Sequence, residues 1–363
     1  MPQLDIPCLL MRGGTSKGPY FLAGDLPDER SALASVLLRL MGSPDVRQID
    51  GLGGGTSLTS KVCIISPSQR EDADVDYLFA QVRVKKKEVD FDANCGNMLS
   101  GVGPFALERG LVPLQEGKTK VRVYNLNVGE IIHLTMQTPD GFLTYVGDTE
   151  IAGVPGQASP IRMDFFGVAG PSSGHLFPTG SPIDDINGVE VTCIDSVNPI
   201  VLMTASSLGK TGQETKEELD KDEDLLQQLQ DIRVEAGQRM GMGDVTEHVV
   251  PKIAYLSPPR DGGTVCSRYF TPNKCHAAHA ISGGIAIGLA CVSPGTVAAP
   301  LAEGLSGNEP DILVEHCSGI LKVHLSINSN ESDPTKRIIS AGAIRTARPI
   351  MDGRVLVPDG LVP

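Results

Sequence analysis

The sequence has no tryptophan, and phenylalanine and tyrosine bring its aromatic content to only 4% of 363 residues. Apolar residues nevertheless make up 40% of the chain, so its interior must be built mainly from aliphatic side chains. A chain of this length exceeds one compact core of ordinary size. We therefore expect two domains with aliphatic cores.

Positive charge is also scarce, because 31 Lys and Arg residues face 44 Asp and Glu residues, for a net charge of −13. Nucleic acids and anionic membranes both require a basic surface, so neither is expected as a partner. No apolar run approaches the ~18 residues that would span a membrane, and the N-terminus does not resemble a signal peptide. A small anionic substrate stays compatible if a few cationic groups and helix N-termini form a local positive pocket.

Closely spaced cysteine pairs are absent too, since none of the eight cysteines forms a C-x-x-C motif. This usage is typical of reduced thiols, and we expect a cytoplasmic protein. One cysteine has unusual neighbours. Cys95 lies between Asn94 and Gly96 in "DFDANCGNMLSGVG", at the expected start of a buried helix over residues 96 to 109, which Pro104 is expected to end or kink. A helix N-terminus lowers a thiol's pKa and favours acid–base chemistry; the alternative is a small buried apolar side chain.

Three local similarities occur twice in the same order, about half a chain apart. "CLLMRGGTSKGPYFL" resembles "CIDSVNPIVLMT", "KVCIISP" resembles "KIAYLSP", and "NCGNMLSGVG" resembles "NKCHAAHAISGGIAIG". An internal repeat of this kind predicts a duplicated fold. We expect a first lobe over 1–184, a second over 185–345 and a terminal strand over 346–363, which either completes the second lobe or returns to the first. Each lobe would bring a thiol at a helix start to a shared cleft.

Two glycine-rich stretches are candidates for carboxylate binding through backbone amides and hydroxyls. The first contains Gly13, Gly14, Thr15 and Ser16, and the second runs from Gly53 through Gly55 and Thr56 to Ser57. Neither matches a phosphate-binding loop or a dinucleotide fingerprint, and ordinary turns are the alternative. Arg268 is the leading candidate for a bidentate carboxylate contact, with Lys17 and Arg12 behind it; a surface ion pair is equally compatible with Arg268.

The segment "CHAAH" brings Cys275, His276 and His279 close together in sequence. Zinc requires at least three protein ligands, and no neighbouring residue completes the set, so no metal site is expected. Packed polar groups at a helix start are favoured instead. An intermediate possibility puts His279 or Ser282 near a substrate carboxylate.

Four long motifs, "MRGGTSKGPYF", "DGLGGGTSLTSKVCIIS", "NCGNMLSGVGPFA" and "RYFTPNKCHAAHAISGGIAI", resemble the PrpF family of cofactor-free isomerases over nearly the whole chain. The resemblance implies an α/β (α+β) fold of the diaminopimelate-epimerase type. In that fold two pseudo-symmetric lobes each wrap a curved, mostly antiparallel sheet around a central helix, and the active site lies in the cleft between them. It also implies proton transfer within unsaturated di- or tricarboxylic acids, with no cofactor and no metal.

From its residues alone, Lys61 on an alternating strand is better explained as a solvent-exposed side chain. The family's functional lysine and cysteine match Lys61 and Cys95, and this resemblance favours the functional role. Cys275 would be the second thiol of the related epimerases, but its surroundings depart from their pattern. We expect catalysis by Lys61 and Cys95, and substrate binding by Ser16, Gly55, Thr56, Ser57, Asn94, Gly96, Asn97, Arg268, Cys275, Ser282 and Gly283.

The resemblance implies keto–enol tautomerisation of a small tricarboxylate, 4-oxalomesaconate, in the degradation of gallate-type aromatic compounds. A homodimer is expected separately, because that state is common for proteins of this size. Isomerisation of aconitate or methylaconitate by a 1,3-allylic proton shift is the first alternative. An amino-acid epimerase and a non-catalytic carboxylate-binding protein are more distant alternatives, and a metal-dependent hydrolase is the least compatible with the sequence.

Overall fold

The computed structural model describes residues 3–271 and 274–358, and the chain divides into two compact units. Unit 1 contains the residues up to Asp164 and those from Ile344 onward, and unit 2 contains Phe165–Ala343. The first boundary therefore precedes the predicted division at 184/185. The segment before 184 joins unit 2 because the Gly170 amide donates to the Asp195 carbonyl and the Asp195 amide donates to the Leu176 carbonyl.

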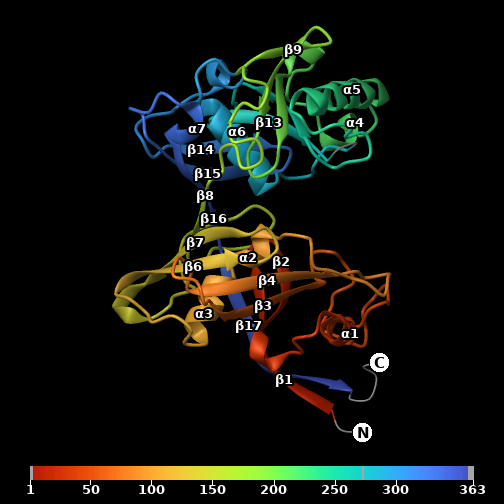
Figure 1. Cartoon of the computed structure of the whole chain (residues 1–363), viewed down its shortest axis with the longest axis vertical. Helices are drawn as coiled ribbons and strands as arrows, with labels where there is room; N and C mark the ends of the chain where they lie inside the picture. The colour runs from red at the N-terminus through yellow and green to blue at the C-terminus, as the bar shows by residue number, and fades with distance from the viewer. Residues whose placement is uncertain (1–2, 272–273, 359–363) are drawn as a thin grey trace. The chain divides into compact units, whose positions relative to one another are not determined.

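Unit 1 is built on a mostly antiparallel sheet with the strand order β17-β1-β2-β3-β4-β6-β7. The β2–β3 and β4–β6 pairs are parallel, and the short β5 pairs with β4. In Figure 1 the first and last strands lie side by side, in red and blue. The strands are β1 (Gln3–Gly13), β2 (Ser16–Leu22), β3 (Lys61–Pro67), β4 (Val75–Val82), β5 (Val89–Asp90), β6 (Gly117–Asn125), β7 (Glu130–Thr138) and β17 (Ala347–Pro358).

Helices cover both faces of this sheet. On one face α1 (Arg30–Met41) packs its aliphatic residues against Phe21, Val62 and Ile64. The Glu29 carboxylate accepts hydrogen bonds from the amides at the start of α1, and Gly42, with a φ of 77°, ends it. On the other face lie α2 (Gly96–Leu99) and α3 (Val102–Glu108).

The predicted buried helix over 96 to 109 is thus two short helices, with the break just before Pro104. Pro104 lies in the first turn of α3, where its missing N–H costs no intrahelical hydrogen bond. If α2 continued as one helix through Pro104, the proline ring would clash with the backbone carbonyl of the residue one turn earlier. The proline therefore decides where the helix restarts.

Unit 2 repeats this plan. Its strands follow in sequence order, β10-β11-β12-β13-β14-β15-β16, with β9 on the free side of β10. The β11–β12 and β13–β14 pairs are parallel. The strands are β9 (Asp184–Ile186), β10 (Val189–Ile194), β11 (Ile200–Thr204), β12 (Lys252–Ser257), β13 (Val265–Phe270), β14 (Asp311–His316), β15 (Gly319–Ile327) and β16 (Ile338–Arg345). Along the chain, β8 (Ile161–Phe166) and β16 each cross a boundary between the units.

The longest helix of unit 2, α5 (Glu223–Arg239), packs on one face of the sheet, and the apolar α6 (Ile281–Val292) packs on the other. The remaining helical segments are short: α4 (Lys216–Leu219), α7 (Pro334–Arg337), and the 3₁₀ turns η1 (Ala23–Asp25), η2 (Pro139–Gly141), η3 (Ser206–Leu208) and η4 (Ala299–Leu301). Among the described residues no helix is long and apolar enough to cross a membrane.

The two units share their strand register as well as their order. In unit 1 the parallel pair β4–β6 brings Val75 opposite Val123, and in unit 2 the parallel pair β13–β14 brings Val265 opposite Val314. In unit 1, α1 joins β2 to β3, and the apolar α2 and α3 follow β4 and the short β5. In unit 2, α5 lies between β11 and β12, and the apolar α6 follows β13. The predicted duplication is confirmed at the level of each unit.

Candidate active site

The two residues expected to be catalytic, Lys61 and Cys95, belong to β3 and to the start of α2 in unit 1. Because successive residues of a strand point to opposite faces, Lys61 and Cys63 of β3 share a face, opposite to Val62, which packs in the α1 core. The same alternation puts Ser16 and Tyr20 of β2 on the face of Lys61, and the Tyr20 hydroxyl donates to the Met98 carbonyl in α2 at 2.5 Å.

Lys61 is buried at the first residue of β3, with 8% of its surface exposed. Its Nζ donates to Gln81 Oε1 at 2.7 Å and lies 5.0 Å from the centre of the Phe79 ring. The alternative of a solvent-exposed Lys61 side chain is therefore contradicted. The Lys61 amine is thus held by a neutral acceptor and an aromatic face, and no carboxylate of the described residues pairs with it.

Gln81 was not among the predicted residues, yet it fixes this ammonium. Its Nε2 donates to the Ser60 carbonyl at 2.8 Å and to the Ser57 carbonyl at 3.2 Å, so its side-chain oxygen faces Lys61. The register of the β3–β4 pair sets Gln81 directly opposite Lys61. The sequence signal was a single glutamine next to the last residue of β4, a mainly apolar strand that also contains Asp76.

Cys95 is the N-cap residue of α2, has an extended backbone and is 9% exposed. Its thiol and the Lys61 ammonium both act on Cys63. Burial, followed by the charge of Cys95, raises the pKa of the Cys63 thiol, while Lys61 lowers it. Both groups therefore act electrostatically on the same buried thiol, Cys63. The buried Tyr20 and Tyr77 hydroxyls adjoin it, and burial raises the pKa of each.

The turn between β1 and β2 packs directly on the start of α2. Asn97 joins them, because its Nδ2 donates to Thr15 Oγ1 at 3.0 Å and its Oδ1 accepts from the Thr15 amide at 3.4 Å. Gly13 and Gly14 allow this approach, since a Cβ on Gly13 would come within 2.7 Å of the Asn97 carbonyl oxygen and Gly14 has a φ of 52°. Ser16 is 2% exposed, and its hydroxyl has no hydrogen-bond partner within the described part of the chain.

In the second glycine-rich loop, backbone amides already donate hydrogen bonds to nearby side chains. The Gly55 amide donates to Gln48 Oε1 at 3.0 Å, and the Thr56 amide donates to Thr59 Oγ1 at 3.3 Å. Thr56 and Ser57 are exposed. The amides of Gly55 and Thr56, two of the three residues predicted to bind substrate here, are thus already engaged, and the loop's observed contribution is the Ser57 carbonyl that orients Gln81.

Asn94 and Gly96 flank Cys95 in different roles. The Asn94 Oδ1 accepts from Asn125 Nδ2 at 3.1 Å, which fixes the chain entering α2. Gly96 is the first residue of the helix, where backbone amides have no intrahelical acceptor.

In unit 2, Ser282 and Gly283 belong to the first turn of α6. Ser282 Oγ accepts from Asn198 Nδ2 at 2.8 Å, which joins the β10–β11 connection to α6. In unit 1 the hydrogen bond between Asn97 and Thr15 joins α2 to the β1–β2 turn in the same way. Gly283 packs against the Tyr269 ring, leaving no room for a side chain. Burial lowers the pKa of the adjoining His279 to about 3, so its imidazole is neutral.

Arg268 and Cys275 lie on the opposite face from Ser282 and Gly283. Arg268 alternates with Tyr269, and its guanidinium donates to the Glu214 carbonyl at 2.8 Å and the Ser267 carbonyl at 3.1 Å. Cys275 packs in the α5 core. The structure therefore does not bring these two residues together with the start of α6.

Cys275 is also not the counterpart of Cys95. It forms an isolated bridge with Phe270, whereas the N-cap of α6 is Ala280. The expected thiol at the start of the second helix is thus wrong, because the chain makes a further turn between the sheet and α6. The nearby His276 Nδ1 accepts from the Ala278 amide, and no cluster of three potential metal ligands occurs in the ranges 3–271 and 274–358.

The remaining predicted cations, Arg12 and Lys17, are paired across β1 and β2. Alternation along β1 and β2 puts Arg12 and Lys17 on the face opposite to Ser16, and Arg12 Nη1 donates to the Gly14 and Thr346 carbonyls at 2.9 Å each. A cation that the sequence did not suggest is Arg345, which precedes Thr346. Burial lowers its pKa to about 10, and its guanidinium donates to the Ile344 carbonyl while meeting no carboxylate of the described residues.

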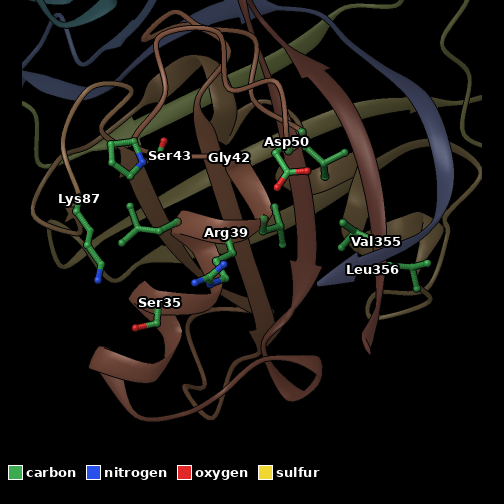
Figure 2. A pocket seen from close by; sticks show the side chains of 13 residues that line it. Ser35, Arg39, Gly42, Ser43, Asp50, Lys87, Val355 and Leu356 are labelled. Atoms are coloured by element: carbon green, nitrogen blue, oxygen red, sulfur yellow. The ribbon is translucent and has the colours of Figure 1, made fainter. Parts of the chain in front are cut away.

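A cavity of about 520 Å³ lies elsewhere in unit 1, beside the end of α1. Figure 2 shows it between Ser35 and Arg39 of the helix, the Lys87 side chain, and Val355 and Leu356 of β17. Neither Lys61 nor Cys95 lines it, so this cavity is separate from the candidate active site.

Comparison with known proteins identifies the family. A family model described as PrpF protein matches residues 3–358. The chain is 50% identical over 357 residues to the 4-oxalomesaconate tautomerase of Pseudomonas putida, covering 98% of this chain and 97% of the relative. It is 46% identical over 351 residues to the (4E)-oxalomesaconate Delta-isomerase of Novosphingobium sp., covering 97% of each chain.

Solved structures agree with this result. A methylitaconate-delta-isomerase superposes with a TM-score of 0.93 at 34% identity, covering 100% of this chain and 98% of the other. A probable proline racemase from Agrobacterium radiobacter superposes with a TM-score of 0.51 at 14% identity, covering 98% of this chain and 95% of the other, which shows a shared fold alone. The chain therefore belongs to the PrpF protein family and is an isomerase.

Proposed function

We propose that this isomerase is a cofactor-independent keto–enol tautomerase acting on 4-oxalomesaconate, with Lys61 and Cys95 as its acid–base pair. The observation that carries the proposal is the buried Lys61 ammonium, which Gln81 and Phe79 hold on the sheet face covered by the helix that begins after Cys95. Such a pair supplies both a proton acceptor and a proton donor without a metal. The similarity to the two oxalomesaconate enzymes supports the substrate.

The proposed chemistry moves one proton. The 2-oxo group acidifies the adjoining CH₂, from which the base removes a proton while the electron pair passes into the carbonyl to give a dienolate. The acid then delivers a proton to the enolate oxygen, or to another carbon for a double-bond shift. The substrate carbonyl serves as the electron sink, so the reaction needs no cofactor. A nearby ammonium stabilises the enolate as charge develops.

Binding the three carboxylates requires donors and positive charge. The free Ser16 hydroxyl and the first-turn amides of Gly96 and Asn97 are the proposed hydrogen-bond donors. Arg345 is the proposed cation for a remote carboxylate, because a desolvated guanidinium without an acidic partner is stabilised when an anion binds. We leave Arg268 and Cys275 out of this set because their side chains lie on the α5 side of unit 2.

The test is proton exchange in deuterated water with 4-oxalomesaconate, followed by NMR and ultraviolet absorbance. We expect the unmodified protein to incorporate deuterium during turnover, and Cys95→Ala and Lys61→Met each to lower kcat by at least ~10². Cys193→Ala and Lys252→Met are matched controls, since Cys193 is a buried thiol of unit 2 and Lys252 is the first residue of β12, the counterpart of β3. Full turnover by Cys95→Ala would remove the thiol from the mechanism.

The same assay distinguishes the alternative substrates. The similarity to methylitaconate-delta-isomerase supports a 1,3-allylic shift on aconitate or methylaconitate as the second candidate. Faster turnover of either acid than of 4-oxalomesaconate would favour that function. Binding of all the acids without deuterium exchange would instead indicate a carboxylate-binding protein.

The biological setting is proposed on the same basis. Tautomerisation of 4-oxalomesaconate belongs to the degradation of gallate-type aromatic compounds, and we propose the cytoplasm as its site because a working thiol must stay reduced. We also propose a homodimer. Light scattering at micromolar concentration tests it, and a monomeric mass with full turnover would contradict it.

A further inference from the structure

Two cysteines that the proposed catalytic mechanism does not use meet in unit 2. The Cys275 and Cys317 sulfurs are 3.7 Å apart, although 42 residues separate them in the chain. Cys275 lies in the bridge with Phe270, and Cys317 lies in the turn between β14 and β15. The separation is that of two hydrogen-bonded thiols and is well above the roughly 2.05 Å of a disulfide bond.

The two thiols are chemically unequal. Their mutual hydrogen bond lowers the pKa of Cys317 to about 6, and the neighbouring Arg268 guanidinium lowers it too, against the opposing effect of burial. The same hydrogen bond, together with burial, raises the pKa of Cys275. Cys317 is partly exposed, whereas Cys275 is 2% exposed. The pair thus joins a partly exposed thiol of lowered pKa to a buried thiol of raised pKa.

The local polar groups keep this arrangement in place. Arg268 is anchored by the Glu214 and Ser267 carbonyls and donates to Cys266 as well. The Cys275 amide donates to Asp220 Oδ1 at 2.8 Å, which fixes the backbone of the buried partner. Because these residues lie on the α5 side of the sheet, the pair is separate from the face that carries the start of α6.

The other cysteines lack this combination. Cys8, Cys63, Cys95, Cys193, Cys266 and Cys291 are all buried, so Cys317 is the most exposed thiol of the chain. An exposed thiolate beside a cation reacts with peroxides, and a second thiol within reach converts the product to a disulfide.

We propose that Cys317 and Cys275 form a peroxide-sensitive dithiol site, with Cys317 as the attacking thiolate and Cys275 as the resolving thiol. The Cys317 thiolate attacks one oxygen of hydrogen peroxide, the O–O bond breaks, and the departing hydroxide takes a proton to become water, which leaves a sulfenic acid. The Cys275 sulfur then attacks that sulfur, its own proton leaves with the hydroxyl as a second water, and the S–S bond forms. In total two thiols are oxidised and one peroxide is reduced to two waters.

Closing the bond requires the sulfurs to approach by less than about 2 Å. The turn that carries Cys317 links two adjacent strands at the surface, so it can supply this movement more readily than the buried Cys275 segment. A low-molecular-weight or protein dithiol would reverse the step by thiol–disulfide exchange.

The experiment treats the intact protein with one to five equivalents of hydrogen peroxide, alkylates the remaining thiols and maps peptides by mass spectrometry without reduction. We expect a crosslink between Cys275 and Cys317, a loss of two hydrogens, and full reversal by dithiothreitol. In Cys275→Ser, a dimedone adduct should accumulate at Cys317, while Cys291→Ser should behave like the unmodified protein.

Two results would overturn the proposal. One is preferential oxidation of Cys95 or another thiol while Cys275 and Cys317 remain alkylatable, and the other is oxidation of Cys317 that stops at the sulfenic acid with Cys275 present. Mapping the unmodified protein decides both, even if a variant fails to fold. Cys317→Ser should resist crosslinking and keep the turnover of the unmodified protein, so the result does not depend on the proposed catalytic function.

Discussion

Gly18 offers a sharp test of how closely the sheet of unit 1 must pack at Lys61. A Cβ added at Gly18 would overlap the Lys61 carbonyl oxygen, far inside the 3.0 Å that real Cβ atoms keep, and would lie 3.1 Å from Met98 Cε. The carbonyl is backbone, so no side-chain rotation relieves the clash. Strands β2 and β3 must separate by more than about 1 Å, and overpacking of this kind costs ~1–3 kcal/mol.

We therefore expect Gly18→Ala to lower the free energy of unfolding by about 1–3 kcal/mol, even after the ~0.4–1 kcal/mol that alanine contributes by restricting the unfolded chain. Because the displaced atom belongs to Lys61, kcat should also fall, by up to ~10² for a shift near 1 Å. Urea unfolding and steady-state kinetics measure the two effects.

Gly24→Ala is the matched control, since a Cβ there meets nothing within 4 Å and its backbone is ordinary. It should leave kcat unchanged and stabilise the protein slightly. If Gly18→Ala matched Gly24→Ala in both measurements, the close approach of β2 to Lys61 would be refuted.

Gln81→Met should lower kcat by about tenfold or more while Lys61 remains, because the ammonium loses its 2.7 Å acceptor; unchanged kinetics would show that Gln81 does not position it. Arg345→Gln should raise KM for a tricarboxylate with little change in kcat. A lower free energy of unfolding with an unchanged KM would exclude a role for Arg345 in carboxylate binding. His279 is protonated below about pH 6.5 in the unfolded chain but stays neutral down to about pH 3 in the folded protein. As the pH is lowered through that window, the free energy of unfolding therefore falls by up to about 1.4 kcal/mol per pH unit. Urea unfolding should thus show a shallower acid-side slope in His279→Phe, and equal slopes would contradict the burial argument. Turnover should survive dialysis against EDTA, and metal-restored activity would contradict the proposed cofactor independence.

Several features of this protein follow from the sequence because they depend on neighbours along the chain. The ends of α1 are set by Glu29 and Gly42, whose effects act within one helical turn. The division of the apolar segment after Cys95 was anticipated from Pro104 for the same reason. The repeated motifs were sufficient to predict a duplicated fold, since each unit repeats the same order of strands and helices.

Tertiary structure decided which residues meet. A shift of one position along a strand moves a side chain to the other face, so the register of β13 put Arg268 on the α5 side although its neighbour Tyr269 contacts the start of α6. Strand pairing likewise set Gln81 opposite Lys61.

The sequence by itself thus determined the local caps and the duplication, which depend on short segments, and its resemblance to the PrpF family supplied the two residues proposed for catalysis. Only the folded chain could bring Cys317 to Cys275 or leave the Ser16 hydroxyl buried without a partner. Such contacts join segments far apart in sequence, and no local preference specifies them, because packing and strand register across the whole unit determine the distance between two side chains.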